Sequence, residues 1–348
     1  MTSLVIEPTQ IRAVIQQQRD YFNAGQTRDI ATRLRCLQAL RRSLLAHETE
    51  LLAALHADLH KPAFEGYAYD LGCLKEIDHA IAHLRRWAKP KWIVPSWEQW
   101  PALGQIRPEP RGVVLIVAPW NYPILLSITP LVGAIAAGNC AIIKPSELAP
   151  ATGRVLAELI RKTFDPGHVT VIEGDIATSQ ALLAEPWDHI FFTGGTATGK
   201  QVMAAAAAHL TPVTLELGGK SPCIVDADVD VAIAAKRIVW GKFLNAGQSC
   251  VAPDYLLVDR RIKPALIEAI ATTIRQFYGD DPAHSPDYAR IVSDRQMARL
   301  TALLQDGTVI IGGQTQIGDR YIAPTVIDDV ALDAPIMQDE IFGPLLPV

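Results

Sequence analysis

The sequence predicts an α/β protein with a doubly wound parallel sheet of five strands, followed by a second α/β domain. From residue 111 onward, short apolar runs alternate with segments whose apolar residues recur three and four positions apart. That alternation is typical of parallel strands joined by helices that cover both faces of a sheet. A chain of 348 residues can also bury a large core, and its length favours two domains over one.

Residues 8–88 precede the sheet and have the apolar period of helices on a charged background. Residues 89–110 differ in composition, because prolines and tryptophans interleave there. They are Pro90, Trp92, Pro95, Trp97, Trp100 and Pro101. We expect an extended arm, which either pairs as an edge strand with another subunit or connects two elements along the surface.

The central part of the chain contains five short apolar segments that we expect to be strands. They span residues 113–117, 140–143, 169–172, 189–192 and 213–217. The helices expected between them span residues 124–137, 151–164, 177–183 and 199–209. Sheets of this kind bind ligands where the carboxyl ends of the strands meet, so the residues after each strand are candidates for a site.

The second α/β region has helices expected near residues 231–243 and 263–277. We assign residues 1–211 to the N-terminal helices and the first α/β domain, and residues 212–348 to the second domain. The apolar, strand-like ending at residues 342–348 predicts that the second domain is incomplete at its carboxyl end.

Composition and charge argue against several classes of protein. The net charge is −5 and the basic residues are scattered, which favours neither nucleic acid nor an anionic membrane surface as a partner. The start of the chain lacks the pattern of a signal peptide, and the longest apolar run, 131–143, is broken and too short to span a bilayer. Five cysteines at irregular spacing do not form a disulfide framework. We therefore expect a cytoplasmic protein.

Cys250 lies in a small, polar, glycine-bearing setting. The other cysteines mostly lie in apolar runs typical of a core: Cys36, Cys73, Cys140 and Cys223. The thiolate is the reactive form, so a thiol with the usual pKa of ~8.5 needs a local electrostatic aid. Gly247 and Gln248 suit a turn whose backbone N–H groups converge on the sulfur. The alternative interpretation is that Cys250 is one more buried small side chain.

The glycine turn after the fourth strand has more than one interpretation. Gly194, Gly199 and Lys200 nearly match a phosphate-binding P-loop, but Gln201 stands where Ser or Thr would bind magnesium. A dinucleotide turn, in which glycines let a pyrophosphate approach a helix N-terminus, lacks the G-x-G-x-x-G fingerprint here. A plain strand-to-helix turn is the third interpretation.

Other polar side chains at strand ends and on helices are ambiguous by themselves. Glu216 ends the fifth strand and is either solvated or held with a raised pKa for proton transfer. Two histidine pairs have the spacing of metal ligands: His56 with His60, and His79 with His83. Neither pair fits the H-E-x-x-H pattern, so we interpret both as solvated helix faces and expect no metal.

Together these stretches resemble the aldehyde dehydrogenase superfamily, and the resemblance spans nearly the whole chain. The matching motifs are PWNYP at 119–123, FTGGT at 192–196, LELGGKSP at 215–222, NAGQSC at 245–250 and EIFGP at 340–344. Cys250 also follows Glu216 by 34 positions, the family's usual interval. The compact N-terminus and the run CVAPDY at the cysteine are similar to the class 3 branch, which oxidises fatty and aromatic aldehydes.

The resemblance implies a catalytic role for three residues. Cys250 would attack the aldehyde carbonyl to form a thiohemiacetal. The Asn121 side-chain amide and the Cys250 backbone N–H would hold the oxyanion, an arrangement worth roughly 3–4 kcal/mol per donor. Hydride transfer to the nicotinamide would leave a thioester, and Glu216 would activate the water that hydrolyses it to the acid.

The resemblance also implies a Rossmann-like dinucleotide-binding domain over 1–211 and a catalytic domain over 212–348. The implied cofactor is NAD or, as for some class 3 relatives, NADP. Lys144 and Glu147 would bind the adenosine ribose, with Glu147 disfavouring a 2′-phosphate. The other implied contacts are Trp120, the pyrophosphate-binding Gly194, Gly195 and Gly199, the ribose-binding Glu340, and Phe342 beside the nicotinamide. The resemblance also implies that the substrate is a small aldehyde and that the protein forms a homodimer.

Two departures from the family pattern accompany this resemblance. Gly195 stands where the family often has Ser, which would weaken pyrophosphate binding slightly. Family members also continue well beyond the 340–344 motif. Two other functions remain as alternatives: a P-loop nucleotide hydrolase using residues 194–200, and a non-catalytic nucleotide-binding or assembly module.

Overall fold

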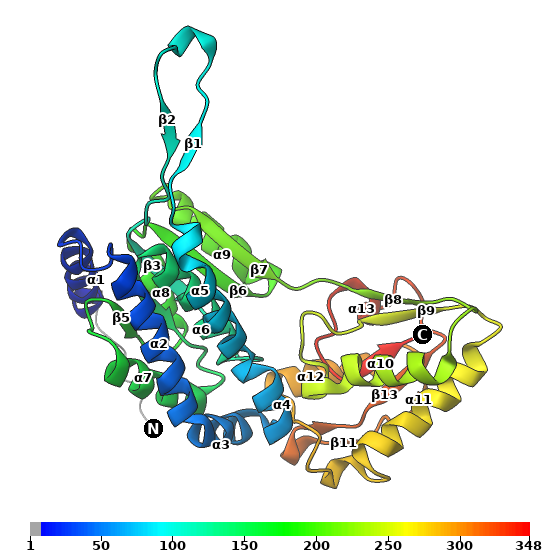
Figure 1. Cartoon of the computed structure of the whole chain (residues 1–348). Helices are drawn as coiled ribbons and strands as arrows, with labels where there is room; N and C mark the ends of the chain where they lie inside the picture. Colours follow the sequence, from blue (N-terminus) through cyan, green and yellow to red (C-terminus); the bar gives the residue numbers. More distant parts are fainter. Residues whose placement is uncertain (1–7) are drawn as a thin grey trace. The chain divides into compact units, whose positions relative to one another are not determined.

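The computed structural model describes residues 8–348 (Figure 1). The described chain forms two compact units, one from residues 8–51 and 68–216 and the other from residues 52–67 and 217–348. This division differs from the expected boundary after residue 211. Residues 213–217 form the last strand of the first unit's sheet, and the segment 52–67 belongs with the second unit.

The first unit contains the predicted parallel five-stranded sheet. Its strands are β3 (Val113–Val117), β4 (Cys140–Lys144), β5 (Val169–Val171), β6 (His189–Gly194) and β7 (Val213–Leu217). Their order is β5-β4-β3-β6-β7, so the sheet grows outward in both directions from β3. Val113 pairs with Cys140, and Val114 pairs with His189, both in parallel register. The predicted α/β fold class is confirmed.

Helices cover both faces of this sheet. The connecting helices are α6 (Leu125–Ala137), α7 (Pro150–Thr163), α8 (Ile176–Leu183) and α9 (Thr196–Ala207). The N-terminal helices of this unit are α1 (Pro8–Asn23), α2 (Ile30–Ala46) and α5 (Cys73–Trp87), with the short η1 (Asp70–Gly72) before α5. Helix α3 (Glu48–Leu59) begins in this unit, but residues 52–59 belong to the second. Helices α2 and α5 pack on α6, whereas α1 packs on β3, β4 and α8. Strand β3 is almost wholly buried between the layers, which explains its unbroken apolar sequence.

The segment between α5 and β3 is a hairpin that stands away from the sheet (Figure 1). Its strands are β1 (Lys91–Ile93) and β2 (Gly104–Ile106), paired antiparallel, with a short η2 (Trp97–Gln99) between them. Its apolar side chains face solvent, including Trp97 and Trp100, which are more than four-fifths exposed (84% and 81%). The extended arm expected here is therefore a two-stranded ribbon.

The second unit is also built from strands and helices. A parallel pair, β8 (Pro222–Val225) and β9 (Tyr255–Val258), is joined through α10 (Val231–Phe243), which packs on α11 (Lys263–Tyr278). A mixed sheet has the order β10 (Thr308–Ile311), β13 (Thr325–Asp328) and β14 (Leu345–Pro347). The remaining elements are α4 (Ala63–Ala68), η3 (Leu244–Gly247), η4 (Pro282–His284), α12 (Asp294–Leu303), β11 (Thr315–Gln316), η5 (Ile317–Asp319), β12 (Tyr321–Ile322) and α13 (Pro335–Gln338).

Within residues 8–348, no helix is both long enough and apolar enough to cross a membrane. The same residues contain no cluster of three or more His, Cys, Asp or Glu side chains that could hold a metal ion.

Candidate active site

The loop that leads to Cys250 has an unusual backbone. After α10 ends at Phe243, three consecutive residues adopt left-handed conformations: Asn245 (φ 50°), Ala246 (φ 51°) and Gly247 (φ 73°). A non-glycine residue in this region costs roughly 1–2 kcal/mol, so the surrounding structure has to hold the loop in place. Gly247 is required for a second reason, because a Cβ there would overlap the carbonyl oxygen of Gly343.

Buried hydrogen bonds hold this loop. The Glu65 carboxylate accepts the backbone N–H of Asn245 at 2.9 Å. The Gln248 side chain is fully buried, donates to the carbonyls of Asn245 (3.0 Å) and Arg290 (2.9 Å), and accepts the N–H of Val292 (2.9 Å). The glutamine of the NAGQSC motif therefore fixes the turn before Cys250 from inside the protein.

The cysteines differ in their surroundings. Burial raises the pKa of both Cys73 and Cys140 to about 12, and it also raises the pKa of Cys36 and Cys223. These four thiols are therefore held protonated at neutral pH. Cys250 is half-buried and lies three positions after the left-handed residues 245–247. It is the candidate nucleophile.

A second group of charges in this unit surrounds Glu340. The Glu340 carboxylate lies against the turn after β7, where Gly219 donates its N–H and a Cβ on Gly218 would overlap the carboxylate. Burial, with a smaller effect from the neighbouring Asp254, raises the pKa of Glu340 to about 7, although the Gly219 N–H, Lys242 and Arg299 act in the opposite direction. A carboxyl group with this pKa exchanges protons near neutral pH.

A partly buried ion pair positions the segment that carries Glu340. Lys220 Nζ lies 2.5 Å from Asp254 Oδ2 and also donates to the carbonyls of Ile336 (2.8 Å) and Asp339 (3.0 Å). Asp254 Oδ1 accepts the N–H of Ile341 at 2.9 Å. One lysine and one aspartate thus fix both sides of the turn that presents Glu340.

Lys242 is a fully buried cation near the charges of Asp254, Lys220 and Glu340. Its amino group has no hydrogen-bond partner among the described residues. Burial lowers its pKa to about 8, although the charges of Asp254 and Glu340 oppose that shift. The arrangement combines a lysine that is readily deprotonated with a carboxyl group that is readily protonated.

The first unit holds Asn121 in the turn after β3. Its side chain is almost completely buried (3% exposed), and Trp120 beside it is half-buried. The buried Asp70 carboxylate accepts the N–H of Ile124 at 3.3 Å, immediately after the PWNYP motif. Asp70, from the segment before α5, therefore helps to fix the turn that carries Asn121.

Lys144 and Glu147 lie together at the carboxyl end of β4. The Lys144 amino group is buried, donates to the Pro145 carbonyl at 2.8 Å, and lies 3.3 Å from the Glu147 carboxylate. Burial lowers the pKa of Lys144, and Glu147 partly offsets that effect. Because Glu147 is exposed, the pair can face a ligand at the strand ends.

The glycine turn leads from β6 into α9. Gly195 is the N-cap residue of α9, and no side chain in the described chain caps the helix there. A Cβ on Gly194 would overlap the Phe192 ring, whereas a Cβ on Gly195 would meet open space. The first N–H groups of a helix need partners and favour anions, so this uncapped end suits a pyrophosphate. Gly199 is buried in the first turns of α9.

The predicted residues are divided between the two units. The first contains Trp120, Asn121, Lys144, Glu147, Gly194, Gly195, Gly199 and the exposed Glu216 of β7; the second contains Cys250, Glu340 and Phe342. Sequence reasoning missed Glu65, Asp70, Asp254 and Lys242. Asp254 lies in the CVAPDY run, but no motif marks the other three, and each of the four residues acts on backbone or charge away from its own position in the sequence.

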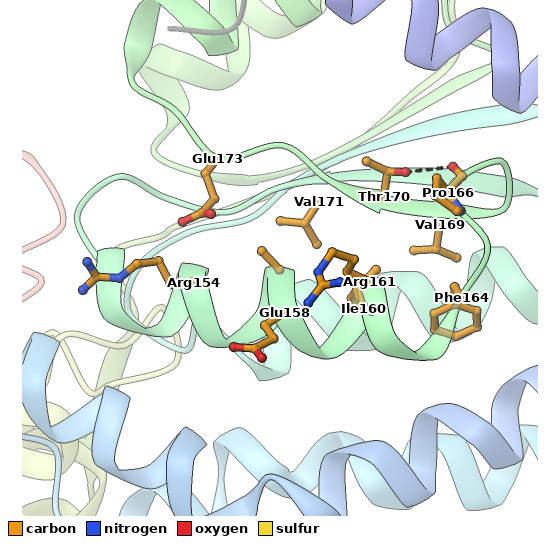
Figure 2. Close-up of a pocket in the computed structure, with 11 residues that line it drawn as sticks. Arg154, Glu158, Ile160, Arg161, Phe164, Pro166, Val169, Thr170, Val171 and Glu173 are labelled. Carbon is orange, nitrogen blue, oxygen red and sulfur yellow. Dashed lines mark hydrogen bonds between the residues drawn. The ribbon is translucent and has the colours of Figure 1, made fainter. Parts of the chain in front are cut away.

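A groove of about 600 Å³ at the β5 edge of the sheet contains none of the predicted site residues (Figure 2). It lies between α7 and β5, and its side chains include Arg154, Glu158, Arg161 and Glu173. Thr170 there donates to the Pro166 carbonyl at 2.8 Å. The candidate site therefore does not include this groove.

The fold and the residues at its strand ends define an α/β protein with an NAD(P)-binding fold. The sequence pattern of the aldehyde dehydrogenase family matches residues 5–348. The chain is 47% identical to aldehyde dehydrogenase family 3 member B1 of Rattus norvegicus, over 96% of this chain and 72% of that protein. It is 46% identical to the dimeric NADP-preferring aldehyde dehydrogenase of Canis lupus familiaris, over 98% and 75%.

A solved structure agrees with the sequence relatives. The substrate-bound state of Staphylococcus aureus AldH superposes with a TM-score of 0.94 and 46% identity, over 97% of this chain and 74% of that one. The chain belongs to the aldehyde dehydrogenase family, whose members are oxidoreductases that act on aldehydes, and its relatives include class 3 members. The family resemblance inferred from the motifs is confirmed.

Proposed function

We propose that the protein oxidises an aliphatic or aromatic aldehyde to the carboxylic acid with Cys250 as the nucleophile. The observation that carries the proposal is the loop 245–247, whose three left-handed residues are anchored by Glu65 and Gln248. Backbone strain of this kind persists only where the surroundings stabilise it, and it concentrates at functional sites.

The chemistry assigned to this chain uses three side chains. Cys250 attacks the carbonyl carbon, and the resulting oxyanion accepts hydrogen bonds from the Asn121 amide and the Cys250 N–H. Loss of a hydride from the same carbon leaves an acyl thioester on the sulfur. Glu216 takes a proton from water, which attacks the thioester, releases the acid and restores the thiolate.

NAD(P)⁺, when bound, would supply the hydride acceptor. The residues present fit this group, because the uncapped N-terminus of α9 favours a pyrophosphate and the exposed Glu147 beside Lys144 suits ribose hydroxyls. Gly194, Gly195 and Gly199 would keep the backbone accessible there. Glu147 also favours NAD over NADP, because a carboxylate repels a 2′-phosphate. NADP remains a second candidate, since one relative is named NADP-preferring.

The second unit would contribute the contacts to the nicotinamide half. Glu340, held by the Gly219 N–H, would accept hydrogen bonds from the ribose, and Phe342 would pack near the ring. Trp120 is the remaining cofactor contact that we propose from the first unit.

A homodimer that uses the 89–110 hairpin is part of the proposal. The exposed tryptophans of the ribbon form the kind of apolar surface that marks a protein interface. One relative is also named as dimeric. A cytoplasmic location is proposed as well, because all five cysteines are free, as a reducing compartment favours.

The test is the formation of NADH or NADPH from a medium-chain aliphatic aldehyde, measured for the wild-type chain, Cys250→Ala and Cys36→Ala. Cys36 is a half-buried thiol in the first unit and serves as the matched control. We expect Cys250→Ala to abolish oxidation and Cys36→Ala to retain it. If Cys250→Ala oxidised the aldehyde as fast as the wild type, Cys250 would not be the nucleophile and the proposal would be wrong.

The P-loop hydrolase alternative receives no support from the relatives. Magnesium-dependent ATP turnover that disappears in Lys200→Ala would be required to restore it. Cofactor binding without any labelling of Cys250 by thiol reagents would instead indicate the non-catalytic binding module.

A further inference from the structure

A groove of about 420 Å³ lies in the second unit, between α4 and the carboxyl ends of α10 and α11. Aromatic rings form its walls, and two carboxylates complete it. The six side chains that matter are Phe64, Glu65, Trp240, Phe277, Tyr278 and Asp287. We call this the aromatic groove. Its volume lies within the range of small-molecule sites.

The rings of the aromatic groove form a connected row. The Phe64 and Trp240 centroids are 6.1 Å apart at an interplanar angle of 63°, and those of Trp240 and Phe277 are 6.4 Å apart at 83°. Phe277 and Tyr278 continue the row at 6.3 Å and 81°. Phe64 remains 63% exposed and Trp240 36% exposed. Ring surface is therefore left facing solvent, where covering it would be favourable.

The electrostatics of the groove are negative. Burial raises the pKa of the Tyr278 phenol, and the carboxylates of Glu65 and Asp287 act in the same direction. The negative charges of both carboxylates are therefore felt at the Tyr278 hydroxyl. Among the described residues that line the groove, none is Lys, Arg or His.

Two helix ends add to the negative electrostatic potential of the groove. Helix α11 ends at Tyr278 and α10 at Phe243, and the carboxyl end of a helix carries a partial negative charge. The basic residues of these last turns, Lys242 and Arg275, do not line the groove. Lys242 is fully buried outside the groove, and Arg275 donates to the Thr272 hydroxyl at 3.3 Å.

We propose that the aromatic groove binds an organic cation, an alkylated ammonium group carried on an apolar body. Aromatic faces attract such cations through the ring quadrupole, and quaternary ammonium groups in particular are bound in aromatic cages. The apolar body would cover the exposed rings of Phe64 and Trp240, while the ammonium group faces Asp287 and the end of α11. Glu65 lines this groove and also holds the loop before Cys250, so the proposal is tested by ligand binding, which is measured separately from aldehyde oxidation.

The test uses two probes of matched shape. (4-Hydroxyphenyl)trimethylammonium carries the charge, and 4-tert-butylphenol replaces the nitrogen with carbon. Binding of each to the whole chain is measured by isothermal titration calorimetry at low salt. We expect saturable binding of the cation, roughly tenfold tighter than that of the neutral probe, and weakening of the cation's binding by added NaCl.

Two substitutions locate the site. Phe64→Leu removes an exposed ring but keeps an apolar side chain, and Asp287→Asn removes an exposed charge without changing shape. Each is expected to weaken cation binding several-fold. Tyr67→Leu and Asp280→Asn are the matched controls, because both residues are exposed and neither lines the groove.

Three results would overturn the proposal: no saturable binding of the cation, equal affinity for the two probes, or equal losses in the groove variants and their controls. All these readouts are direct binding measurements. A protein that failed to oxidise aldehydes would therefore leave the proposal standing, and the reverse also holds.

Discussion

The carboxylate of Glu65 accepts a hydrogen bond from the backbone N–H of Asn245 at 2.9 Å, although 180 positions separate the two residues in the sequence. Asn245 is the first of the three left-handed residues that lead to Cys250. A residue of the short helix α4 (Ala63–Ala68) therefore holds the start of the proposed nucleophile loop.

Replacing Glu65 tests that contact. Glu65→Ala leaves the Asn245 N–H buried without its acceptor, which should cost roughly 1–3 kcal/mol of unfolding free energy. Glu65→Gln keeps an acceptor oxygen and should lose less. Urea unfolding and the rate of Cys250 alkylation are the measurements, with faster alkylation expected in Glu65→Ala if the loop loosens. Identical behaviour of the two variants would show that the hydrogen bond does not hold the loop.

Gly247→Ala should be strongly destabilising. The residue has φ of 73°, and the added methyl group would overlap the Gly343 carbonyl. We expect a loss of about 1–3 kcal/mol from the backbone alone, with a further loss from the overlap, and impaired aldehyde oxidation. Gly72→Ala is the control, since a Cβ there meets nothing within 4 Å and φ is −56°. Unfolding of both alanine variants at the same urea concentration as the wild type would contradict this prediction.

The Lys220–Asp254 ion pair should contribute far more than an exposed pair. In Lys220→Met, the buried Asp254 carboxylate loses its cation, which typically costs roughly 3–5 kcal/mol. The turn at 336–341 would also lose its two lysine hydrogen bonds. Arg261→Met breaks an exposed pair with Asp259 and should change urea unfolding little. Equal effects of the two substitutions would contradict this interpretation.

The raised pKa of Glu340 predicts a pH dependence of stability. Its ordinary value of 4.5 applies to the unfolded chain, and its value in the folded protein is about 7. Between these values the folded state binds a proton that the unfolded state has released. The contribution of Glu340 to stability is therefore present below pH 4.5 and is lost as the pH rises toward 7.

Glu340→Gln should flatten that part of the profile. The measurement is the unfolding free energy of wild type and variant at several pH values from about 5 to 7.5. We expect the variant to gain stability relative to wild type as the pH rises. Parallel profiles would mean that Glu340 titrates normally in the folded protein.

The sheet was predictable because its strands are buried on both faces. A short apolar run such as 113–117, flanked by helical segments, indicates a buried parallel strand more strongly than any other structure. Element ends were less accurate: β6 continues to Gly194, and α9 begins at Thr196 instead of residue 199. Gly195, the N-cap residue of that helix, has no side chain that could cap it, so no side chain in the sequence signals where the helix starts.

The candidate site was predictable only in part. Motifs indicated Cys250, Asn121 and Glu216 because their chemistry depends on residue type in a local pattern. The supports of the site depend on contacts between distant segments, as Glu65 on Asn245 and Asp70 on Ile124 show. Helical periodicity in 52–67 likewise does not reveal which unit that segment packs against.

The covalent intermediate provides the most direct test of the central claim. Glu216→Gln should slow hydrolysis of the thioester, because the amide cannot take a proton from water. After this variant is mixed with NAD⁺ and an aldehyde, peptide mass spectrometry should find the corresponding acyl group on Cys250. Cys73, Cys140, Cys36 and Cys223 should remain unmodified. Aldehyde oxidation without any acyl group on Cys250, or with the acyl group on another cysteine, would contradict the mechanism.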